Sequence, residues 1–150
     1  MEKRRRRWSR LLWTVPAAVL AVGGLAYGAM SMMTPPDDLD LWLSRMSPGG
    51  AYLTTISPNV DPVSVGPLHT WTVELKTADG KPVDGASVAI NGGMPQHGHG
   101  LPTAPQVTRN LGEGRYLVEG MKFNMPGWWT IEVEVGGPAG RDETVFNLVL

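Results

Sequence analysis

Alternation of apolar and polar side chains is the dominant pattern in the chain after residue 50. Residues 69–77 and 128–135 both follow the two-residue period of a strand that buries one face, and they place Trp71 and Trp129 on the buried side. Shorter β-branched or aromatic runs predict further strands at residues 52–56, 87–90, 106–110, 115–118 and 144–150, with 122–125 extending or bending the strand before it. The pattern therefore predicts substantial burial of both tryptophans.

Glycine and proline separate these runs. Asp79-Gly80 suits a tight hairpin, whereas Pro102 and Pro105 argue against regular structure around them. Roughly six to eight short strands over about 100 residues are typical of an antiparallel sandwich, and no amphipathic helical period follows residue 50. The sequence therefore predicts one all-β domain at residues 50–150, without a helix longer than about two turns.

The N-terminal part of the chain pairs a basic cluster with a long apolar run. Six of the 13 Lys and Arg residues lie in residues 1–10, and residues 11–33 carry no charge. A helix rising about 1.5 Å per residue needs roughly 20 residues to cross a bilayer, so this run is long enough. Because basic residues stay on the cytoplasmic side, the run predicts a single-pass signal anchor in the cytoplasmic membrane, with the following domain on the periplasmic or extracellular side. A cleaved secretory signal, ending near the small residues Ala26 and Gly28, is the alternative.

Residues 34–49 connect this run to the β domain. Pro35, Pro36 and three aspartates predict an extended acidic tether. The apolar residues that follow indicate a short amphipathic turn, lying on the membrane surface or against the domain; they are Leu39, Leu41, Trp42, Leu43 and Met46. The expected organisation is a cytoplasmic N-terminus at 1–10, an anchor at 11–33, a tether at 34–49 and a β-sandwich at 50–150.

Charge and cysteine content exclude several classes of function. Residues 34–150 hold 7 basic and 13 acidic side chains, a formal net charge of 7 − 13 = −6. Such a domain lacks the clustered Lys and Arg that nucleic-acid binding needs, so no nucleic-acid partner is expected. The absence of cysteine removes disulfides, thiolate nucleophiles and thiolate metal sites. A metal site in this chain must use His, Met, carboxylate or backbone ligands.

Two of the three histidines lie in one glycine-rich segment at residues 94–100. Gly98 separates His97 from His99, and Met94 lies three residues upstream. Gly98 and Gly100 permit backbone dihedrals that aim two imidazoles at one point, which favours a metal site. The other interpretation is a glycine-rich connection whose histidines hydrogen-bond to backbone carbonyls, because His-x-His alone is common. The spacing leaves both interpretations open.

Four motifs follow one another along the second half of the chain. They are Leu-His-Thr-Trp at 68–71, Gly-Met-Pro-Gln-His-Gly-His-Gly-Leu-Pro-Thr at 93–103, Leu-Gly-Glu-Gly-Arg-Tyr at 111–116 and Gly-Met-Lys-Phe-Asn-Met-Pro-Gly-Trp-Trp at 120–129. In this combination the chain resembles the YtkA-like family, also described as FixH-like, over about residues 50–150. The resemblance implies a single immunoglobulin-like β-sandwich, usually behind an N-terminal anchor, on the outer side of the bacterial cytoplasmic membrane. Some relatives are associated with copper delivery to haem-copper oxidases, and many have no assigned role.

The resemblance also identifies candidate ligands. The family's Met-Pro-x-His-Gly-His-Gly segment falls on residues 94–100, and its Phe-x-Met-Pro-Gly-Trp segment falls on residues 123–128. His69, which opens a predicted strand, and Met121 add further donors of the same kinds. The candidate metal ligands are His97, His99, Met94, Met125, His69 and Met121. Soft thioethers favour copper(I) and imidazole tolerates both oxidation states, so copper(I) is the expected ion. In the alternative interpretation Met121 and Met125 fill the core, and His69 is a capped edge residue.

Three classes of function remain. The first is an anchored copper-binding or copper-delivery protein that serves a membrane oxidase or another copper-handling complex. The second is a non-metal interaction module that docks on a membrane protein complex, with the histidine segment as architecture. An enzyme is the least favoured, because the chain lacks a Gly-x-Ser-x-Gly elbow, a His-Glu-x-x-His helix and a carboxylate pair near the histidines. We expect no enzymatic activity.

Overall fold

The computed structural model describes residues 34–150, so the predicted cytoplasmic segment and the predicted anchor at 11–33 lie outside the described residues. Within residues 34–150 no helix is long and apolar enough to cross a membrane. The chain from Pro35 to Leu150 forms one folding unit of nine strands. They are β1 Ser44–Met46, β2 Tyr52–Pro58, β3 Leu68–Thr77, β4 Ser87–Met94, β5 His99–Gly100, β6 Gln106–Gly112, β7 Arg115–Lys122, β8 Trp128–Gly137 and β9 Gly140–Val149.

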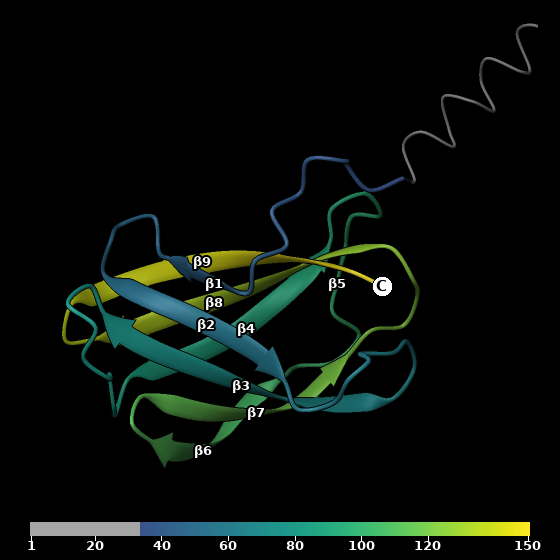
Figure 1. The fold of residues 1–150 in the computed structure, drawn as a ribbon. Helices are drawn as coiled ribbons and strands as arrows, with labels where there is room; N and C mark the ends of the chain where they lie inside the picture. The colour runs from purple at the N-terminus through teal and green to yellow at the C-terminus, as the bar shows by residue number, and fades with distance from the viewer. Residues whose placement is uncertain (1–33) are drawn as a thin grey trace, which may run out of the picture. The chain divides into compact units, whose positions relative to one another are not determined.

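The strands form two antiparallel sheets that pack face to face as a β-sandwich (Figure 1). One sheet has the strand order β1-β2-β3-β7-β6, and the other has the order β5-β4-β8-β9. The prediction of an all-β domain built from antiparallel strands is confirmed for the described residues.

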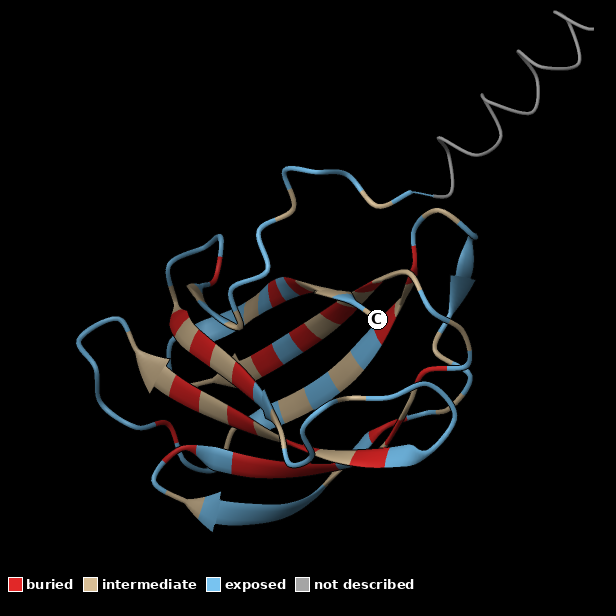
Figure 2. Cartoon of the chain, turned by 45° about the vertical axis from the view of Figure 1, so that its right-hand side comes forward, coloured by how far each residue is buried: buried red, intermediate tan, exposed pale blue. Residues whose placement is uncertain are grey.

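The core lies between the two sheets and is built by the alternation seen in the sequence. Buried bands recur at every second residue along the long strands (Figure 2). Trp71 on β3 is 2% exposed and Trp129 on β8 is 0% exposed, so the predicted burial of both tryptophans is confirmed. Aromatic side chains of this size dominate the apolar surface removed from water, and Phe123 joins the two by contacting both rings edge-on.

Two strands were not predicted. β1 lies within the predicted tether at 34–49, where a short amphipathic turn was expected, and its Ser44 pairs with Thr55 of β2. β5 lies in the segment where prolines argued against regular structure, and it consists of His99 and Gly100 alone. Both are short edge strands, and a pairing of two or three residues leaves too little periodicity to detect in sequence.

The Asp79-Gly80 turn is tight, as predicted, but it does not join paired strands. The Gly80 amide donates to the Thr77 carbonyl at 2.9 Å, and the chain returns only through an isolated bridge between Lys76 and Pro82. The next strand, β4, lies in the other sheet. The turn therefore begins a crossover between the two sheets rather than a hairpin.

A buried tyrosine holds this crossover in place. The Tyr116 side chain on β7 is 2% exposed, and its hydroxyl donates to the Val83 carbonyl at 2.6 Å. The same hydroxyl accepts a hydrogen bond from the Ala86 amide at 3.0 Å. Tyr52 acts similarly at another turn, donating to the Gly140 carbonyl and accepting from the Ala139 amide. Each hydroxyl satisfies loop backbone groups that strand pairing leaves unpaired.

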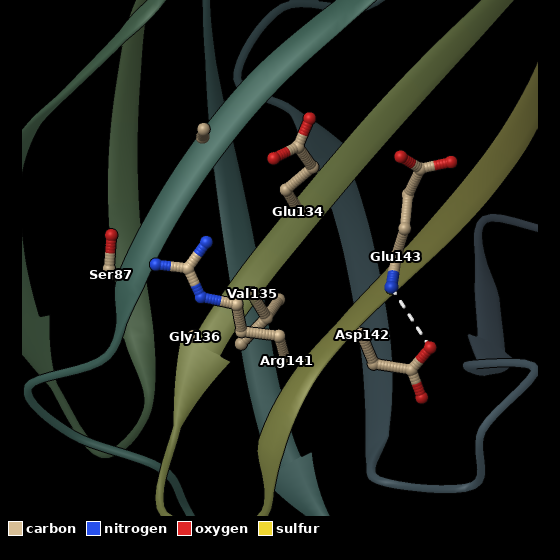
Figure 3. A pocket seen from close by; sticks show the side chains of 8 residues that line it. Ser87, Glu134, Val135, Gly136, Arg141, Asp142 and Glu143 are labelled. Carbon is tan, nitrogen blue, oxygen red and sulfur yellow. Dashed lines mark hydrogen bonds between the residues drawn. The ribbon is translucent and has the colours of Figure 1, made fainter.

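A carboxylate fixes the loop between β1 and β2. Asp142, near the start of β9, accepts a hydrogen bond from the Glu143 amide at 3.0 Å (Figure 3). It also accepts one from the Ala51 amide at 3.4 Å. Hydrogen bonding from the Ser47 side chain and from these amides holds the pKa of the Asp142 carboxyl below its usual value. The contact is close, because a Cβ on Gly49 would lie 2.6 Å from the carboxylate oxygen Oδ2.

We expect Tyr116→Phe to lower the free energy of unfolding by about 1–3 kcal/mol, because it leaves the Val83 carbonyl and the Ala86 amide without their partner. Urea denaturation of the parent and the variant measures the loss. Thr108→Val removes an exposed hydroxyl from β6 and is the matched control, expected to change stability by less than about 0.5 kcal/mol. Equal midpoints for the Tyr116 variant and the parent would contradict this role.

We also expect Asp142 to contribute stability that depends on pH. Because the folded-state pKa is lowered, the contribution is present above the unfolded-state pKa and is lost as the pH falls through the folded-state pKa. The stability difference between the parent and Asp142→Asn should therefore shrink as the pH is lowered from 7 to below about 3. Denaturant titrations across this range measure it, with Glu119→Gln, at an exposed carboxylate, as the control. A pH-independent difference would argue against a role of the charge.

Candidate metal centre

The histidine segment forms a short hairpin at one end of the four-stranded sheet. β4 ends at Met94, a turn follows, and β5 returns so that Met94 pairs with His99 and Gly93 pairs with Gly100. The amides of His97 and Gly98 both donate to the Met94 carbonyl, at 3.0 and 2.9 Å. Gly98 has a φ of 66°, in the left-handed region that glycine adopts without steric cost. The hairpin thus fixes the backbone of both histidines.

Glycines at the end of β4 allow this hairpin to form. A Cβ at Gly93 would lie 2.5 Å from the His99 carbonyl oxygen, and one at Gly92 would lie 2.2 Å from the Thr130 carbonyl oxygen. Side chains at these positions would separate β4 from β5 on one side and from β8 on the other. The two glycines therefore set the close approach of three strands beneath the histidines.

The two imidazoles of the hairpin lie next to each other. His97 and His99 are both exposed, and their ring centroids are 5.9 Å apart. The Nδ1 atom of His99 lies 3.1 Å from the Gly100 carbonyl oxygen. A carbonyl only accepts hydrogen bonds, so Nδ1 carries the hydrogen in this contact. In the neutral ring the lone pair is then on Nε2, which is the nitrogen left to bind a metal.

His99 also packs on the core. Its ring meets the ring of Trp129 edge-on, with centroids 5.9 Å apart, and Trp129 in turn contacts Phe123 at 5.3 Å. The Trp129 indole donates to the Met125 carbonyl at 3.1 Å. A buried tryptophan therefore joins the histidine hairpin to residues 123–127, the loop between β7 and β8.

The structure brings two of the candidate methionines to this region. Met94 is directly opposite His99 in the β4–β5 pair, so the two side chains project from the same face of the sheet. The Met94 side chain is 1% exposed and reaches residues 123–127, because its ε-methyl would lie 3.0 Å from a Cβ on Gly127. Met125 is partly buried against the core and is held through its carbonyl by Trp129. His99 and Met125 thus contact Trp129, Met94 approaches Gly127, and His97 lies beside His99.

The other two candidates lie in the five-stranded sheet. His69 and Met121 are cross-strand partners on β3 and β7, and they are 4% and 1% exposed. The His69 Nε2 atom donates to the Ser64 carbonyl at 2.7 Å, and its ring packs against Phe123. In the series of ring contacts, Phe123 and Trp129 stand between His69 and His99. These contacts place His69 and Met121 in the core rather than on the hairpin.

Sequence reasoning missed the residues that organise this end of the sandwich. Trp129 was expected to be core, and its contacts with His99 and Met125 follow from the meeting of two loops that are far apart in sequence. The strict alternation of β8 was the available signal for Trp129, because it places this second residue of the strand on the inner face. The partner ring on that face depends on the pairing order of the strands.

Among residues 34–150, no three His, Asp or Glu side chains come together as a metal-binding group. A shallow hollow beside the hairpin is lined by Met94, His99, Thr130 and Glu132 among others. The donors available at this end of the described chain are therefore two imidazoles and the thioethers of the methionines, together with single carboxylates at the margin.

A second hollow lies at the other end of the four-stranded sheet (Figure 3). Glu134 and Glu143 face each other across β8 and β9 there, and the Arg141 side chain extends towards Ser87. None of the predicted ligands lies among its lining residues. The hairpin end of the sandwich therefore remains the candidate site.

Comparison with known proteins places the chain in a family. The sequence model of a family described as YtkA-like matches residues 51–134, which is more than half of the chain. The matched region runs from the start of β2 through most of β8 and includes the histidine hairpin and residues 123–127. Searches of curated proteins and of solved structures gave no match.

We expect Gly93→Ala to detach β5 from β4, because the new Cβ would meet the His99 carbonyl at 2.5 Å. The Leu101 amide, which donates to the Gly92 carbonyl at 3.0 Å, should then exchange its hydrogen faster. Amide exchange followed by NMR measures this. Gly136→Ala in β8 is the matched control, because its Cβ would have no contact closer than 3.8 Å. Unchanged exchange at Leu101 would show that the hairpin does not depend on this close approach.

Proposed function

We propose that this chain, which belongs to the YtkA-like family, binds copper(I) through its histidine hairpin and delivers it to a membrane protein. His97 and His99 would hold the ion, and methionine sulfur would complete the site. In this proposal the domain is an immunoglobulin-like sandwich of the FixH-like type. It is anchored by residues 11–33 on the outer side of the cytoplasmic membrane, and a respiratory oxidase or another copper-handling complex receives the ion.

The observation that carries the proposal is the spacing of the two imidazoles. A ring nitrogen lies about 1.1 Å from its centroid and a metal–nitrogen bond is about 2 Å long, so two imidazoles sharing one ion have centroids up to about 6 Å apart. The centroids of His97 and His99 are 5.9 Å apart. This separation supports a single ion shared by the two rings, and the Nδ1 hydrogen bond of His99 leaves its Nε2 as the ligand atom.

The neighbouring thioethers favour copper(I) over other ions. Met94 lies opposite His99 in the hairpin, and Met125 lies on the adjoining loop. A site of imidazole and thioether ligands carries no negative charge and is soft, which suits copper(I) better than zinc(II) or a hard cation. His69 and Met121 were candidates on sequence, but they pair with each other in the five-stranded sheet, and the His69 Nε2 atom is already bound to the Ser64 carbonyl, which favours a structural role.

Exposure of the histidines favours transfer over storage. Both imidazoles lie on the surface, His97 in the turn and His99 at the start of β5, where a partner's ligands can approach an ion directly. A sealed, rigid site would release its ion slowly. The same end of the domain thus combines a fixed backbone with accessible nitrogen atoms, as ligand exchange between two proteins requires.

A second candidate function is a non-metal interaction module that docks on a membrane complex. The observation that favours it is the packing of His99, whose ring rests on Trp129 and whose Nδ1 bonds a backbone carbonyl. Those are the contacts of an architectural histidine. His97 distinguishes the two functions, because metal binding needs its imidazole and architecture does not.

We expect the His97→Ala/His99→Ala double variant of the full chain to lose copper(I) binding while keeping its thermal unfolding transition. Competition with a chromophoric copper(I) chelator measures binding. Acidification should weaken parent binding, because a protonated imidazole has no free lone pair for a metal. A double variant that binds copper(I) as the parent does would overturn the proposal.

Methionine variants test the thioethers within the same experiment. Met125→Leu conserves volume and should weaken copper(I) binding, with a stability cost below about 1.5 kcal/mol. Met46→Leu is the matched control, because Met46 is 44% exposed on β1, in the other sheet, and should bind as the parent does. Equal binding by the two variants would remove Met125 from the site and leave the histidines as the ligands.

A further inference from the structure

Leu41 and Trp42 project from the surface just before β1. Trp42 is 77% exposed, the highest value among the large hydrophobic side chains of the described residues, and Leu41 is 52% exposed. Together with Leu39 and Asp40 they line a shallow hollow. Exposure of adjoining apolar side chains to water is unfavourable, and such a patch is typical of an interaction surface. We call these two residues the apolar tip.

The apolar tip is held rigidly on the domain. Arg45 forms an ion pair with Asp40 at 2.8 Å and donates to the Val145 carbonyl at 2.9 Å. The Asn147 side chain donates to the Asp40 carbonyl at 2.9 Å, and the Trp42 amide donates to the Asp40 carboxylate at 2.9 Å. These bonds fasten residues 40–45 to β9. The direction in which the apolar tip points is therefore fixed relative to the sandwich.

The apolar tip lies at the same end of the sandwich as the histidine hairpin. β1 runs antiparallel to β2, so the residues before Ser44 extend towards Pro58, where β2 ends. The same end holds the last residues of β9, to which Asp40 is bound, and the hairpin that follows β4. The chain that leads into β1 and the β5 hairpin are neighbours at this end (Figure 1). A surface that covers the apolar tip therefore contacts the end of the sandwich that carries the hairpin.

The length of the preceding chain identifies what can cover the apolar tip. The uncharged run ends at residue 33, so eight residues separate it from Trp42. A chain of that length spans at most about 30 Å when fully extended. If residues 11–33 cross a bilayer, Trp42 cannot leave the neighbourhood of the membrane surface. Tryptophan is the side chain that favours the interface between lipid headgroups and hydrocarbon.

We propose that Leu41 and Trp42 insert into the outer surface of the bilayer and turn the histidine hairpin towards the membrane. The surface is zwitterionic lipid, because Asp37, Asp38 and Asp40 adjoin the apolar tip and would repel anionic headgroups. The inference rests on the anchored location in the proposed function and deepens it. A copper(I) ion held at the hairpin would face the outer end of a membrane-embedded acceptor rather than the bulk compartment.

The chain has no cysteine, so a single introduced cysteine gives a unique label. We would place a donor dye at Pro95→Cys in the hairpin turn, or at Leu111→Cys next to the β6–β7 turn, at the opposite end. The two ends are about 30 Å apart, given ten-residue strands rising about 3.3 Å per residue. Energy transfer to acceptor-labelled headgroups is measured with the full chain in phosphatidylcholine vesicles. Transfer should be strong from residue 95 and weak from residue 111.

Substitutions at the apolar tip provide the decisive comparison. In Leu41→Ser/Trp42→Ser the difference between the two labels should be lost, because the domain then tumbles on its tether. Val60→Ser/Val65→Ser replaces two other exposed apolar residues, 41% and 38% exposed, and should keep the difference. Equal transfer from the two labels in the parent would overturn the inference. Loss of the difference between the labels in Val60→Ser/Val65→Ser would also overturn it, because the membrane contact would then belong to the whole end of the sandwich.

Further measurements separate this inference from the proposed function. Vesicle flotation tests the anchor, and a parent chain that does not float overturns the orientation as well. Energy transfer between labelled copies in the same vesicles would assign the apolar tip to a second copy if it is lost in Leu41→Ser/Trp42→Ser. That result would overturn the lipid assignment. Copper(I) titration of Leu41→Ser/Trp42→Ser should match that of the parent. If the parent chain binds copper(I) but the two labels show no preferred orientation, the inference alone is refuted. If the labels show the orientation but the parent chain binds no copper(I), the proposed function alone is refuted.

Discussion

The burial of Trp129 between the two sheets is the interaction on which this end of the molecule depends. Its ring contacts Phe123 on the side of the five-stranded sheet and His99 on the hairpin, and its indole nitrogen binds the Met125 carbonyl. One side chain therefore fixes the position of two loops that are far apart in sequence. Because a fully buried tryptophan removes a large apolar area from water, displacing either loop would expose it at a considerable cost in free energy.

The hairpin combines a fixed backbone with exposed side chains, which suits a binding site on the surface. The backbone of the hairpin is fixed by pairing with β4 and by the contact of His99 with the core, while the imidazoles themselves lie at the surface. His69 shows the opposite combination. It is buried, and its Nε2 is the atom bound to a carbonyl, whereas in His99 that atom is Nδ1. The same residue type thus serves the fold in β3 and can serve chemistry in β5.

The segment before β1 is bound to the folded domain. Asp40, Arg45 and Asn147 bind it to β9, so the route from the N-terminal run into the domain is part of the folded structure from Asp40 onward. If residues 11–33 form the proposed anchor, only residues 34–39 separate it from the part of the chain that is bound to β9. A domain on a long flexible linker would not be constrained in this way, because its orientation would average out.

The sequence alone was sufficient to predict the long strands, their buried faces and the all-β class. Trp71 and Trp129 were placed inside because period-two alternation fixes the face on which each side chain lies. The turn at Asp79-Gly80 was also predicted, because its conformation depends on local dihedral preferences. The short strands β1 and β5 escaped detection, since their pairing is decided by neighbours rather than by their own two or three residues.

What the tertiary structure decided is which residues meet. The sequence provided six candidate ligands but did not indicate which of them lie close together. The strand order places His69 and Met121 in one sheet. It places His97, His99 and Met94 at the end of the other. Likewise, the sequence showed an apolar segment before the domain, but only the fold placed Trp42 at the end that carries the hairpin. The physical reason is that periodicity determines the face of each strand, whereas the contacts between faces depend on the long-range pairing order, which no local pattern encodes.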